Sequence, residues 1–419
     1  MARRNGTSAT PQASLPLPPP FRGPTGEALI GKKHLVAGLF AGVGGLERGL
    51  HRSGHETALL CENDAAAVSI LRARFLDVPL HGDVRSLTRL PWGTSLVAAG
   101  FPCQDLSQAG KTAGISGTRS GLVGEVFRLM KKHEVPWVLL ENVPFMLQLN
   151  AGRAMEVITG EFERLGYKWA YRVVDSRAFG LPQRRRRVYF VATLDGDPRT
   201  IVFADEASEP VHDERIATTK ACGFYWTEGI RGLGWAVDAV PTLKGGSTIG
   251  IPSAPAILLP NGALVLPDIR DAERLQGFPS DWTKPAETVT RRGVRWKLVG
   301  NAVSVPAAAW LGRRFRRPGR LLPFEVSGLK LGRTWPEAAW NVDGQRVRVH
   351  ASEWPVRYAY QSLAGFLKFP TIPLSMKAAA GFLARTKRST LNFPPHLIAA
   401  LNVHLDGHTG TVVRQSLAA

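Results

Sequence analysis

The sequence predicts an α/β fold built on a parallel, doubly wound sheet. Segments with helical spacing, such as GLERGLHRSG and AAAVSILRARF, alternate with short apolar runs. Strands that alternate with helices form parallel sheets, and such sheets bind ligands beyond the carboxyl ends of their strands. We therefore expect the functional residues where the apolar runs end. Five runs have the length and composition of buried strands: residues 34–40, 57–62, 95–101, 137–142 and 187–193.

Length and composition predict a soluble protein with more than one domain. The chain has 419 residues and an apolar fraction of 44%, and it contains no run of about 18 apolar residues that could span a membrane. Its three cysteines, Cys61, Cys103 and Cys222, are widely spaced, which predicts neither disulfides nor a metal site. Residues 1–30 are rich in proline and contain no signal-peptide pattern, so we expect a disordered arm on a cytoplasmic protein.

The charge of the chain predicts a polyanionic partner. The formal net charge is +19, and Lys and Arg that neutralise phosphates release condensed counterions. A merely soluble basic protein is the alternative. The charge is uneven: residues 193–267 contain 5 Lys and Arg against 9 Asp and Glu, whereas residues 311–419 contain 16 against 5.

The first apolar run leads into a glycine-rich turn. Gly42, Gly44 and Gly45 precede a helix, where the backbone can turn tightly and free N–H groups can face a ligand. Glu62 ends the next run, where a carboxylate could accept hydrogen bonds from ribose hydroxyls. Glu47 stands where a dinucleotide pattern needs its third glycine, which favours an adenosine cofactor without a pyrophosphate, such as S-adenosylmethionine, over a nicotinamide. A tight structural turn is the alternative.

Cys103 follows the run 95–101 after Pro102 and opens a glycine-rich loop. A cysteine at this place could act as a nucleophile beneath a closing loop, although an apolar core position is the usual environment of a cysteine. Glu141 ends the run 137–142, where a buried carboxyl group could donate a proton. A helix cap or an exposed strand end is the alternative for this glutamate.

Alternate basic residues enter the last of the five runs. Gln183, Arg185 and Arg187 are two residues apart, so on an extended segment they share one face. Arg184 and Arg186 would then face the other way. A basic run is usually a solvated surface, but arginines that lead into an apolar strand favour a site.

Eight motifs in one order resemble the cytosine-5 DNA methyltransferase family. They are LFAGVGG, CEND, GDV, GFPCQ, ENV, QRRRR, ERLQGFPSDW and GNAVSVP, and they extend over about residues 34–310. The resemblance implies a Rossmann-like S-adenosylmethionine methyltransferase domain with a small target-recognition domain and a C-terminal extension. We divide the chain into residues 1–30 (arm), 31–192 (catalytic, cofactor-binding domain), 193–267 (target-recognition region), 268–316 (late motifs that return to the catalytic domain) and 317–419 (basic extension that could form a small DNA-contacting domain).

The resemblance also implies roles for individual residues. Cys103 would attack carbon 6 of a flipped-out cytosine, Glu141 would act at ring N3, and Arg187 with Arg185 would bind the exocyclic carbonyl and the glutamate. Cofactor contacts are expected from Phe40, Gly42, Gly44, Gly45, Leu46, Glu62, Asn63, Asp83, Val84, Pro102, Asn301 and Val303. DNA contacts are expected from Gln104, Ser107, Arg119, Gln183, Thr242 and Leu243.

Two stretches depart from the family pattern. Gly38 stands where many members have Asp, so a polar contact beside the cofactor turn is absent or comes from another residue. In SGTRSGLVGEV only Arg119 and Leu122 match comfortably, which leaves the details of that loop open.

The resemblance also predicts the partners. We expect a monomer acting on double-stranded DNA near the nucleoid, with a separate restriction endonuclease as a possible partner. The basic extension is expected to supply phosphate contacts. Its aromatic residues, including Trp335, Trp340, Trp354, Tyr358 and Tyr360, are expected to pack in a core of its own, with stacking on bases as the alternative. An RNA cytosine-5 methyltransferase and a non-catalytic DNA-binding regulator remain alternatives.

Overall fold

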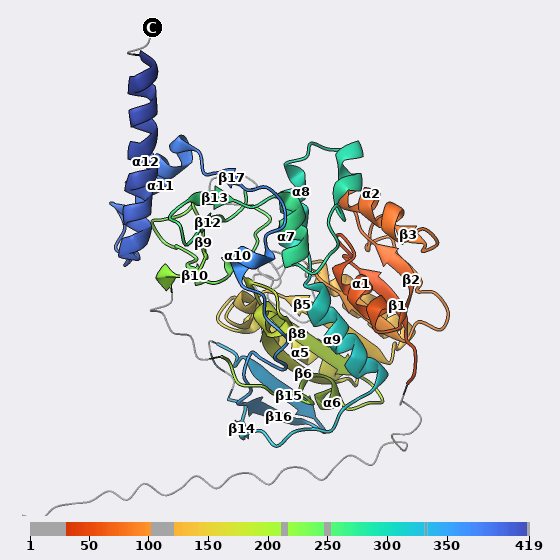
Figure 1. Ribbon diagram of the computed structural model, residues 1–419. Coiled ribbons are helices and arrows are strands. Elements are labelled where there is room, and N and C mark those ends of the chain that lie inside the picture. The colour runs from red at the N-terminus through yellow and green to blue at the C-terminus, as the bar shows by residue number, and fades with distance from the viewer. Residues whose placement is uncertain are drawn as a thin grey trace, which may run out of the picture.

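The protein folds into a large lobe around a long sheet and a smaller lobe around a second sheet (Figure 1). The computed structural model describes the backbone of residues 31–101, 121–210, 217–246, 253–330, 332 and 334–416, and side chains up to residue 406. The predicted arm, residues 1–30, lies outside these segments. Within the described residues, no helix is both long and apolar enough to cross a bilayer, and no group of His, Cys, Asp and Glu could bind a metal ion.

The main sheet has the strand order β14-β16-β15-β6-β8-β5-β4-β1-β2-β3. The five predicted runs form β1, β2, β4, β5 and β8. The bounds of the strands are β1 (Leu35–Leu39), β2 (Glu56–Cys61), β3 (Leu80–His81), β4 (Leu96–Ala99), β5 (Trp137–Asn142), β6 (Lys168–Asp175), β8 (Arg186–Thr193), β14 (Val326–Gly328), β15 (Ala338–Val342) and β16 (Gln345–Val349).

The sheet is mixed, which corrects the prediction of a parallel sheet. Strands β1, β2, β3, β4 and β5 pair in parallel, but β8 is antiparallel to both β5 and β6. The connection from β6 to β8 contains only a short 3₁₀ helix (Ser176–Phe179) and the two-residue β7 (Gln183–Arg184). This connection is too short for a parallel crossover, which needs about a dozen residues or more. An apolar run predicts a strand but not its direction.

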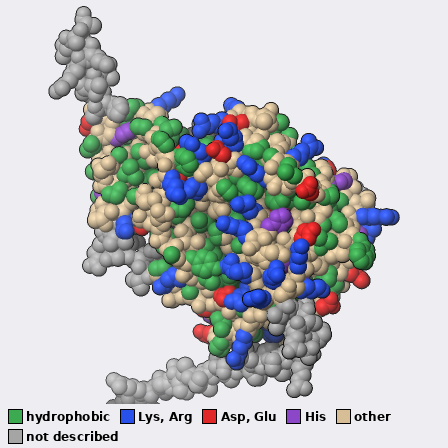
Figure 2. Space-filling model, turned by 45° about the vertical axis from the view of Figure 1, so that its right-hand side comes forward, with side chains coloured by type: hydrophobic (Ala, Val, Ile, Leu, Met, Phe, Trp, Pro, Cys, Tyr) green, Lys and Arg blue, Asp and Glu red, His purple; other side chains and the backbone are tan. Residues whose placement is uncertain are grey.

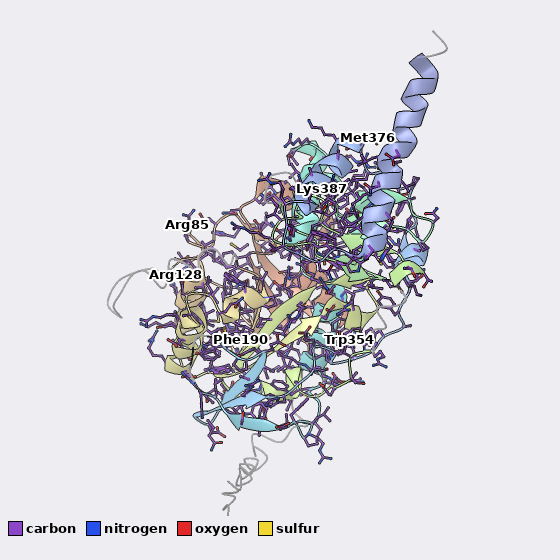
Figure 3. All side chains as sticks on the ribbon, turned by 90° about the vertical axis from the view of Figure 1, so that its left-hand side faces the viewer. Arg85, Arg128, Phe190, Trp354, Met376 and Lys387 are labelled. Atoms are coloured by element: carbon purple, nitrogen blue, oxygen red, sulfur yellow. The ribbon has the colours of Figure 1, made fainter. Side chains whose placement is uncertain are left out.

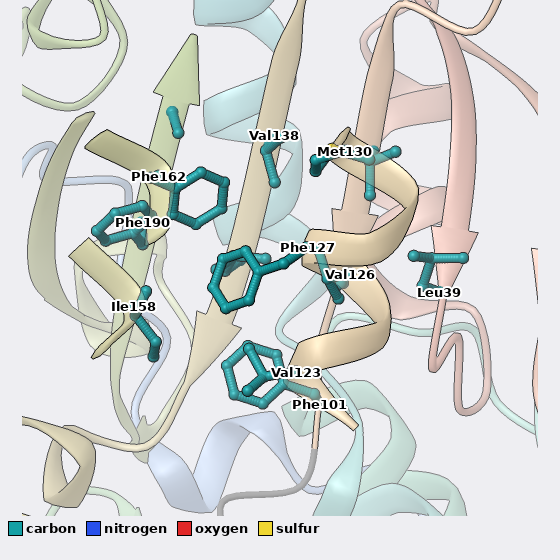
Figure 4. Close-up of a cluster of buried hydrophobic side chains, with 14 of the residues drawn as sticks. Leu39, Phe101, Val123, Val126, Phe127, Met130, Val138, Ile158, Phe162 and Phe190 are labelled. Carbon is teal, nitrogen blue, oxygen red and sulfur yellow. The ribbon is translucent and has the colours of Figure 1, made fainter. Parts of the chain in front are cut away.

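Helices cover both faces of the main sheet. Alternate residues of each strand point to opposite faces, so Val138 packs toward α4 and α5 whereas Leu139 packs toward α1 and α9. Figure 4 shows the first of these clusters, in which Phe127, Phe162 and Phe190 meet. The helices of this lobe are α1 (Gly45–Arg52), α2 (Ala65–Arg74), α4 (Val123–His133), α5 (Arg153–Arg164), α6 (Arg199–Val202), α7 (Ile269–Leu275), α8 (Val294–Asn301) and α9 (Val305–Arg316).

The smaller lobe has a sheet of strand order β10-β9-β12-β13-β17. Its strands are β9 (Cys222–Phe224), β10 (Ala236–Val237), β12 (Ala256–Leu258), β13 (Leu264–Leu266) and β17 (Ile372–Pro373), and a separate pair joins β7 to β11 (Val240–Pro241). Helices α10 (Leu363–Phe366), α11 (Met376–Thr386) and α12 (Pro395–Ser416) come from the end of the chain. A cluster that includes Phe224, Leu264, Phe382 and Leu401 joins α11 and α12 to this sheet.

The C-terminal extension therefore contributes to both sheets. Its strands β14, β15 and β16 continue the main sheet from the edge of β6. The tryptophans expected in a core of the extension's own are buried, but Trp340 and Trp354 lie in the core beneath α9, and Trp335 lies in the core beneath α4 and α5. Tyr358 and Tyr360 are exposed, which corrects the prediction of a core position for them. The extension pairs with β6 because an edge strand offers unpaired backbone groups. Basic side chains outnumber acidic ones on the face in Figure 2, in line with the net charge.

Candidate active site

A cavity of about 480 Å³ lies where the parallel strands of the main sheet end. This volume suits a small-molecule site. Phe40, Glu62, Gly100 and Glu141 line it from the ends of β1, β2, β4 and β5. Seven of the predicted cofactor residues line the cavity, namely Phe40, Gly42, Glu62, Asn63, Asp83, Val84 and Asn301, together with the predicted catalytic residues Glu141, Arg185 and Arg187.

The glycine turn brings its backbone to the cavity at Gly42. This residue has a φ of 55°, and a Cβ there would meet no atom within 4 Å. Its N–H donates to Oε2 of Glu62 at 2.8 Å, while Oε1 of Glu62 accepts from the N–H groups of Asn63 and Asp64 at 2.9 and 2.8 Å. The Glu62 carboxylate therefore fixes the turn and the start of α2 around the same space.

The other two glycines of the turn lie behind the cavity, in close packing. A Cβ at Gly44 would come within 2.5 Å of the Phe75 ring, and one at Gly45 within 2.7 Å of the Val303 carbonyl oxygen. Leu46 is buried in the core beside Val303. These four predicted cofactor residues do not line the cavity; they shape it by bringing α1 against the late motif.

Asp83 lines the cavity from the segment that follows β3. Its carboxylate accepts from the backbone N–H of Arg85 at 2.9 Å and from the Arg85 guanidinium at 3.0 Å. These hydrogen bonds lower the pKa of Asp83 to about 2. A carboxylate that stays ionised at neutral pH can accept hydrogen bonds from a ligand.

Glu47 explains the glycine at position 38. A Cβ at Gly38 would overlap Oε1 of Glu47, whose side chain is fully buried. Both carboxyl oxygens of Glu47 lack a hydrogen-bond partner among the described residues. Burial raises the pKa of Glu47 to about 8. A carboxyl group from α1 therefore occupies the space beside Gly38 on β1, and this group is protonated at neutral pH.

Glu141 and Arg187 form the polar centre of the cavity wall. Nε of Arg187 lies 3.1 Å from Oε1 of Glu141, and both side chains are about 10% exposed. The approach is not aligned as a hydrogen bond, so Oε1 remains without a donor among the described residues. An arginine next to a carboxylate with free bonding capacity can bind a polar ring between them.

Arg185 anchors the cavity wall through backbone carbonyls. Its guanidinium is fully buried and donates to the carbonyl oxygens of Leu243 and Gly300 at 3.2 Å and of Ala302 at 2.6 Å. Burial and the charge of Arg187 lower the pKa of Arg185 to about 9. Arg185 thus joins the late motif to the smaller lobe, and Arg187 is the arginine beside Glu141.

Gln183 also joins the two lobes. It is fully buried; its amide N–H donates to the Leu275 carbonyl oxygen at 2.8 Å, and its amide oxygen accepts from the N–H of Leu243 at 3.0 Å. Thr242 is bonded in turn to the Arg184 carbonyl oxygen at 2.8 Å. The shared face of Gln183, Arg185 and Arg187 is confirmed, and a DNA contact by Gln183, Thr242 or Leu243 stays a prediction.

The predicted nucleophile lies outside the described residues. This holds for Cys103 and equally for Pro102, Gln104, Ser107 and Arg119. The described chain leads to them along the cavity wall, since Gly100 and Phe101 line the cavity. The other two cysteines are buried, and burial raises the pKa of Cys61 to about 12 and that of Cys222 to about 11. Neither is a thiolate at neutral pH.

Several cavity residues had no predicted role in the site, among them Lys297, Asn142 and Leu122. Lys297 of α8 lines the cavity and pairs with Asp64 at 3.3 Å. Asn142 donates from its side chain to the Phe101 carbonyl oxygen at 3.1 Å and so connects the ends of β4 and β5. Leu122 closes the apolar side. The ENV motif contained a signal for Asn142, whereas a lone lysine on a helix resembles a solvated one.

The fold and the site define a doubly wound α/β enzyme with a nucleotide-type pocket beside an acid–arginine pair. The family described as C-5 cytosine-specific DNA methylase matches residues 36–225. The chain is 47% identical over 379 residues to the Type II methyltransferase M2.BsuMI of Bacillus subtilis (strain 168), covering 87% of this chain and 97% of the relative. It is 29% identical over 293 residues to the Type II methyltransferase M.NgoBI of Neisseria gonorrhoeae, covering 64% and 88%. The crystal structure of S. pombe Dnmt2 methyltransferase aligns with a TM-score of 0.48 at 17% identity over 68% and 99% of the two chains.

The chain belongs to the C-5 cytosine-specific DNA methylase family and is a DNA (cytosine-5) methyltransferase. The predicted family, enzyme class and Rossmann-like methyltransferase fold are thereby confirmed.

Proposed function

We propose that this enzyme transfers a methyl group from S-adenosylmethionine to carbon 5 of a flipped-out cytosine within a specific duplex DNA sequence. The relatives named as Type II methyltransferases support a role as the modification half of a restriction system, or as a methylase without a partner endonuclease. We place its action on nucleoid DNA in the cytoplasm, as a monomer. The observation that supports this function best is that Glu141 and Arg187 share one cavity with the glycine turn.

The cavity suits S-adenosylmethionine on three grounds. At Gly42 a Cβ would fill space that is otherwise free, so only glycine leaves room for a ligand at the turn. Glu62 and Asp83 place two carboxylates at strand ends, where ribose hydroxyls and a ring amino group can donate to them. Phe40 and Val84 supply apolar walls. When bound, this cofactor supplies an electrophilic methyl group.

Carbon 5 of cytosine is a poor nucleophile, so residues of the chain must increase its electron density before it can accept the methyl group. The Cys103 thiolate forms a bond to carbon 6, and the electron pair of the 5,6 double bond becomes available at carbon 5. Glu141 donates a proton at ring N3, while Arg187 binds the exocyclic oxygen and orients the Glu141 carboxyl group. Once carbon 5 has gained its methyl group, its proton is lost, the sulfur–carbon bond breaks and the ring becomes aromatic again. The base must leave the stacked duplex to reach these groups.

Labelled cofactor and two nucleic acids test this function. We expect label in duplex DNA and none in transfer RNA. Label in RNA alone would make the enzyme an RNA methyltransferase, and label in neither would make it a non-catalytic DNA-binding regulator. Bisulfite sequencing of DNA from cells that express the chain then identifies the target sequence.

A cysteine substitution tests the covalent step. Cys103→Ser should abolish transfer, whereas Cys222→Ala, at a buried cysteine that does not line the cavity, should retain it. A target duplex with fluorine at carbon 5 of the cytosine should stay attached to the natural enzyme, because fluorine cannot leave as a cation. A Cys103→Ser enzyme that still forms the attached species would contradict the assigned nucleophile.

A further inference from the structure

The smaller lobe is assembled from two distant parts of the chain. Residues 217–266 supply β9 to β13, and the last part of the chain supplies β17, α11 and α12. The two parts differ in charge. Residues 354–405 contain six Lys and Arg and no Asp or Glu, whereas residues 193–267 are acidic overall. The end of the chain therefore brings positive charge to a lobe whose first part lacks it.

The end of α11 is fixed against a loop of the first part, residues 226–231. Arg385 donates from Nε to the Glu228 carbonyl oxygen at 2.6 Å and from Nη2 to the Trp226 carbonyl oxygen at 2.7 Å. Just beyond the helix, the Ser389 hydroxyl donates to the Ile230 carbonyl oxygen at 2.9 Å. These bonds hold the turn between α11 and α12 in one place beside the loop.

The same loop is connected to the active-site cavity. The Glu228 carboxylate pairs with Lys244. The Lys244 backbone is packed so closely on α8 that a Cβ at Gly300 would overlap its carbonyl group, and a Cβ at Gly245 would overlap the Asn301 side chain. Gly300 and Asn301 line the cavity. Three steps of direct contact thus lead from the turn at the end of α11 to the cavity wall.

Three cations stand on this loop and turn: Arg231, Lys387 and Arg388, here called the basic rim. All three are exposed, and none forms an ion pair with another described residue. In Figure 3, Lys387 lies on the same side of α12 as Arg85 of the large lobe. Exposed lysine and arginine side chains without an ion-pair partner among the described residues can bind the phosphate backbone of a nucleic acid, and these three stand on a loop and turn that are connected to the cavity wall by direct contacts.

We propose that the basic rim binds the phosphate backbone of duplex DNA next to the target base, so that DNA recognition depends on the C-terminal helices as well as on residues 217–266. This proposal rests on the proposed function. It assigns Lys387 and Arg388 to positioning of the duplex and not to the chemistry, because they lie outside the cavity. Contacts to phosphates fix register without reading sequence.

The triple substitution Arg231→Gln, Lys387→Gln, Arg388→Gln in the full chain tests the proposal. We expect weaker DNA binding and a salt dependence of log K that is less steep by about 2 to 3, since each phosphate contact contributes about 0.9 to the slope. Point substitutions are needed because deletion of the extension would also remove β14 to β16 from the main sheet. The free energy of unfolding and the affinity for S-adenosylmethionine monitor the fold.

A matched control removes three charges elsewhere. Arg317, Arg320 and Lys330 are exposed and lie on the segment from α9 to β15, on the large lobe. Their triple substitution to Gln should leave the slope within about 1 of the natural value. An unchanged slope in the rim variant, or an equal loss in the control, would overturn the proposal. Absence of DNA methylation by the natural enzyme would instead overturn the proposed function.

Discussion

At the scale of single residues, the geometry of Glu141 indicates which of its carboxyl oxygens can contact the substrate ring. Oε1 of Glu141 lies 3.1 Å from Nε of Arg187 yet accepts no hydrogen bond from a described residue, so one carboxyl oxygen is free for the substrate ring. Glu141→Gln keeps the shape but can neither donate a carboxyl proton nor attract Arg187 by charge. We expect methyl transfer to fall by about 10²- to 10⁴-fold, the usual contribution of a general acid. Labelled transfer to the target duplex measures this.

The matched control is Glu161→Gln, at a half-buried acid on α5 whose one ion-pair partner among the described residues is Arg164 along the helix. Its transfer rate should stay close to the natural one. If both variants kept full activity, Glu141 would not be the proton donor.

Glu47 predicts an unusual dependence of stability on pH. Its pKa rises from 4.5 in the unfolded chain to about 8 in the folded protein because it is buried without a partner. Between these values the folded state binds more protons, so this group's contribution to stability falls as the pH rises from 4.5 to 8. At pH 7 the cost is on the order of 3 kcal/mol. Glu47→Gln should remove this dependence and raise the free energy of unfolding near neutral pH.

Denaturant unfolding at pH 5, 7 and 9 measures the difference between the two proteins. We expect the variant to gain little at pH 5 and most at pH 9. A gain of the same size at all three values would show that Glu47 does not titrate in this window.

At the scale of elements, the sequence predicted the strand ends and the parallel pairing of β1, β2, β4 and β5, but missed the direction of β8. The runs that became β1, β2, β4, β5 and β8 end within two residues of the prediction, because a buried strand needs a continuous apolar run. The antiparallel course of β8 could not be predicted, since an apolar run has no polarity. Three of the five predicted glycine and late-motif contacts, Gly44, Gly45 and Val303, proved to be packing behind the cavity, because a short motif does not distinguish a residue that touches a ligand from one that supports it.

The glycine turn provides the element-scale prediction. Gly45→Ala would bring a Cβ within 2.7 Å of the Val303 carbonyl oxygen, between α1 and the late motif. We expect a loss of about 1 to 3 kcal/mol of unfolding free energy, typical of overpacking. Gly42→Ala meets no protein atom within 4 Å, so its main effect should be weaker binding of S-adenosylmethionine.

Calorimetry for the cofactor and denaturant unfolding for the fold separate the two variants. Because Gly42 has a φ of 55°, Gly42→Ala should lower the free energy of unfolding by about 1 kcal/mol, whatever its effect on the cofactor. Equal cofactor affinities in the two variants would show that Gly42 does not face the ligand.

At the scale of the whole molecule, the sequence could not show where the C-terminal extension goes. Its tryptophans are buried, as a core position requires, but in the core of the large lobe. Its last helices complete the smaller lobe instead. Both placements depend on edges and faces offered by segments more than 100 residues away, such as β6 and β13, and local periodicity contains no information on such pairings.

This division predicts that the two lobes can be destabilised separately. Leu397 and Leu401 of α12 are fully buried against the smaller sheet. Replacing both by Ala should cost about 2 to 5 kcal/mol each, which is enough to unfold the smaller lobe of a marginally stable protein. The cofactor turn lies on the large lobe, so we expect DNA binding to be lost while S-adenosylmethionine still binds.

Val403→Ala, at a residue 71% exposed on the same helix, should change neither. If cofactor binding were lost together with DNA binding, the two lobes would unfold as one cooperative unit. The contacts of Arg185 and Gln183 between the lobes would then be strong enough to couple them.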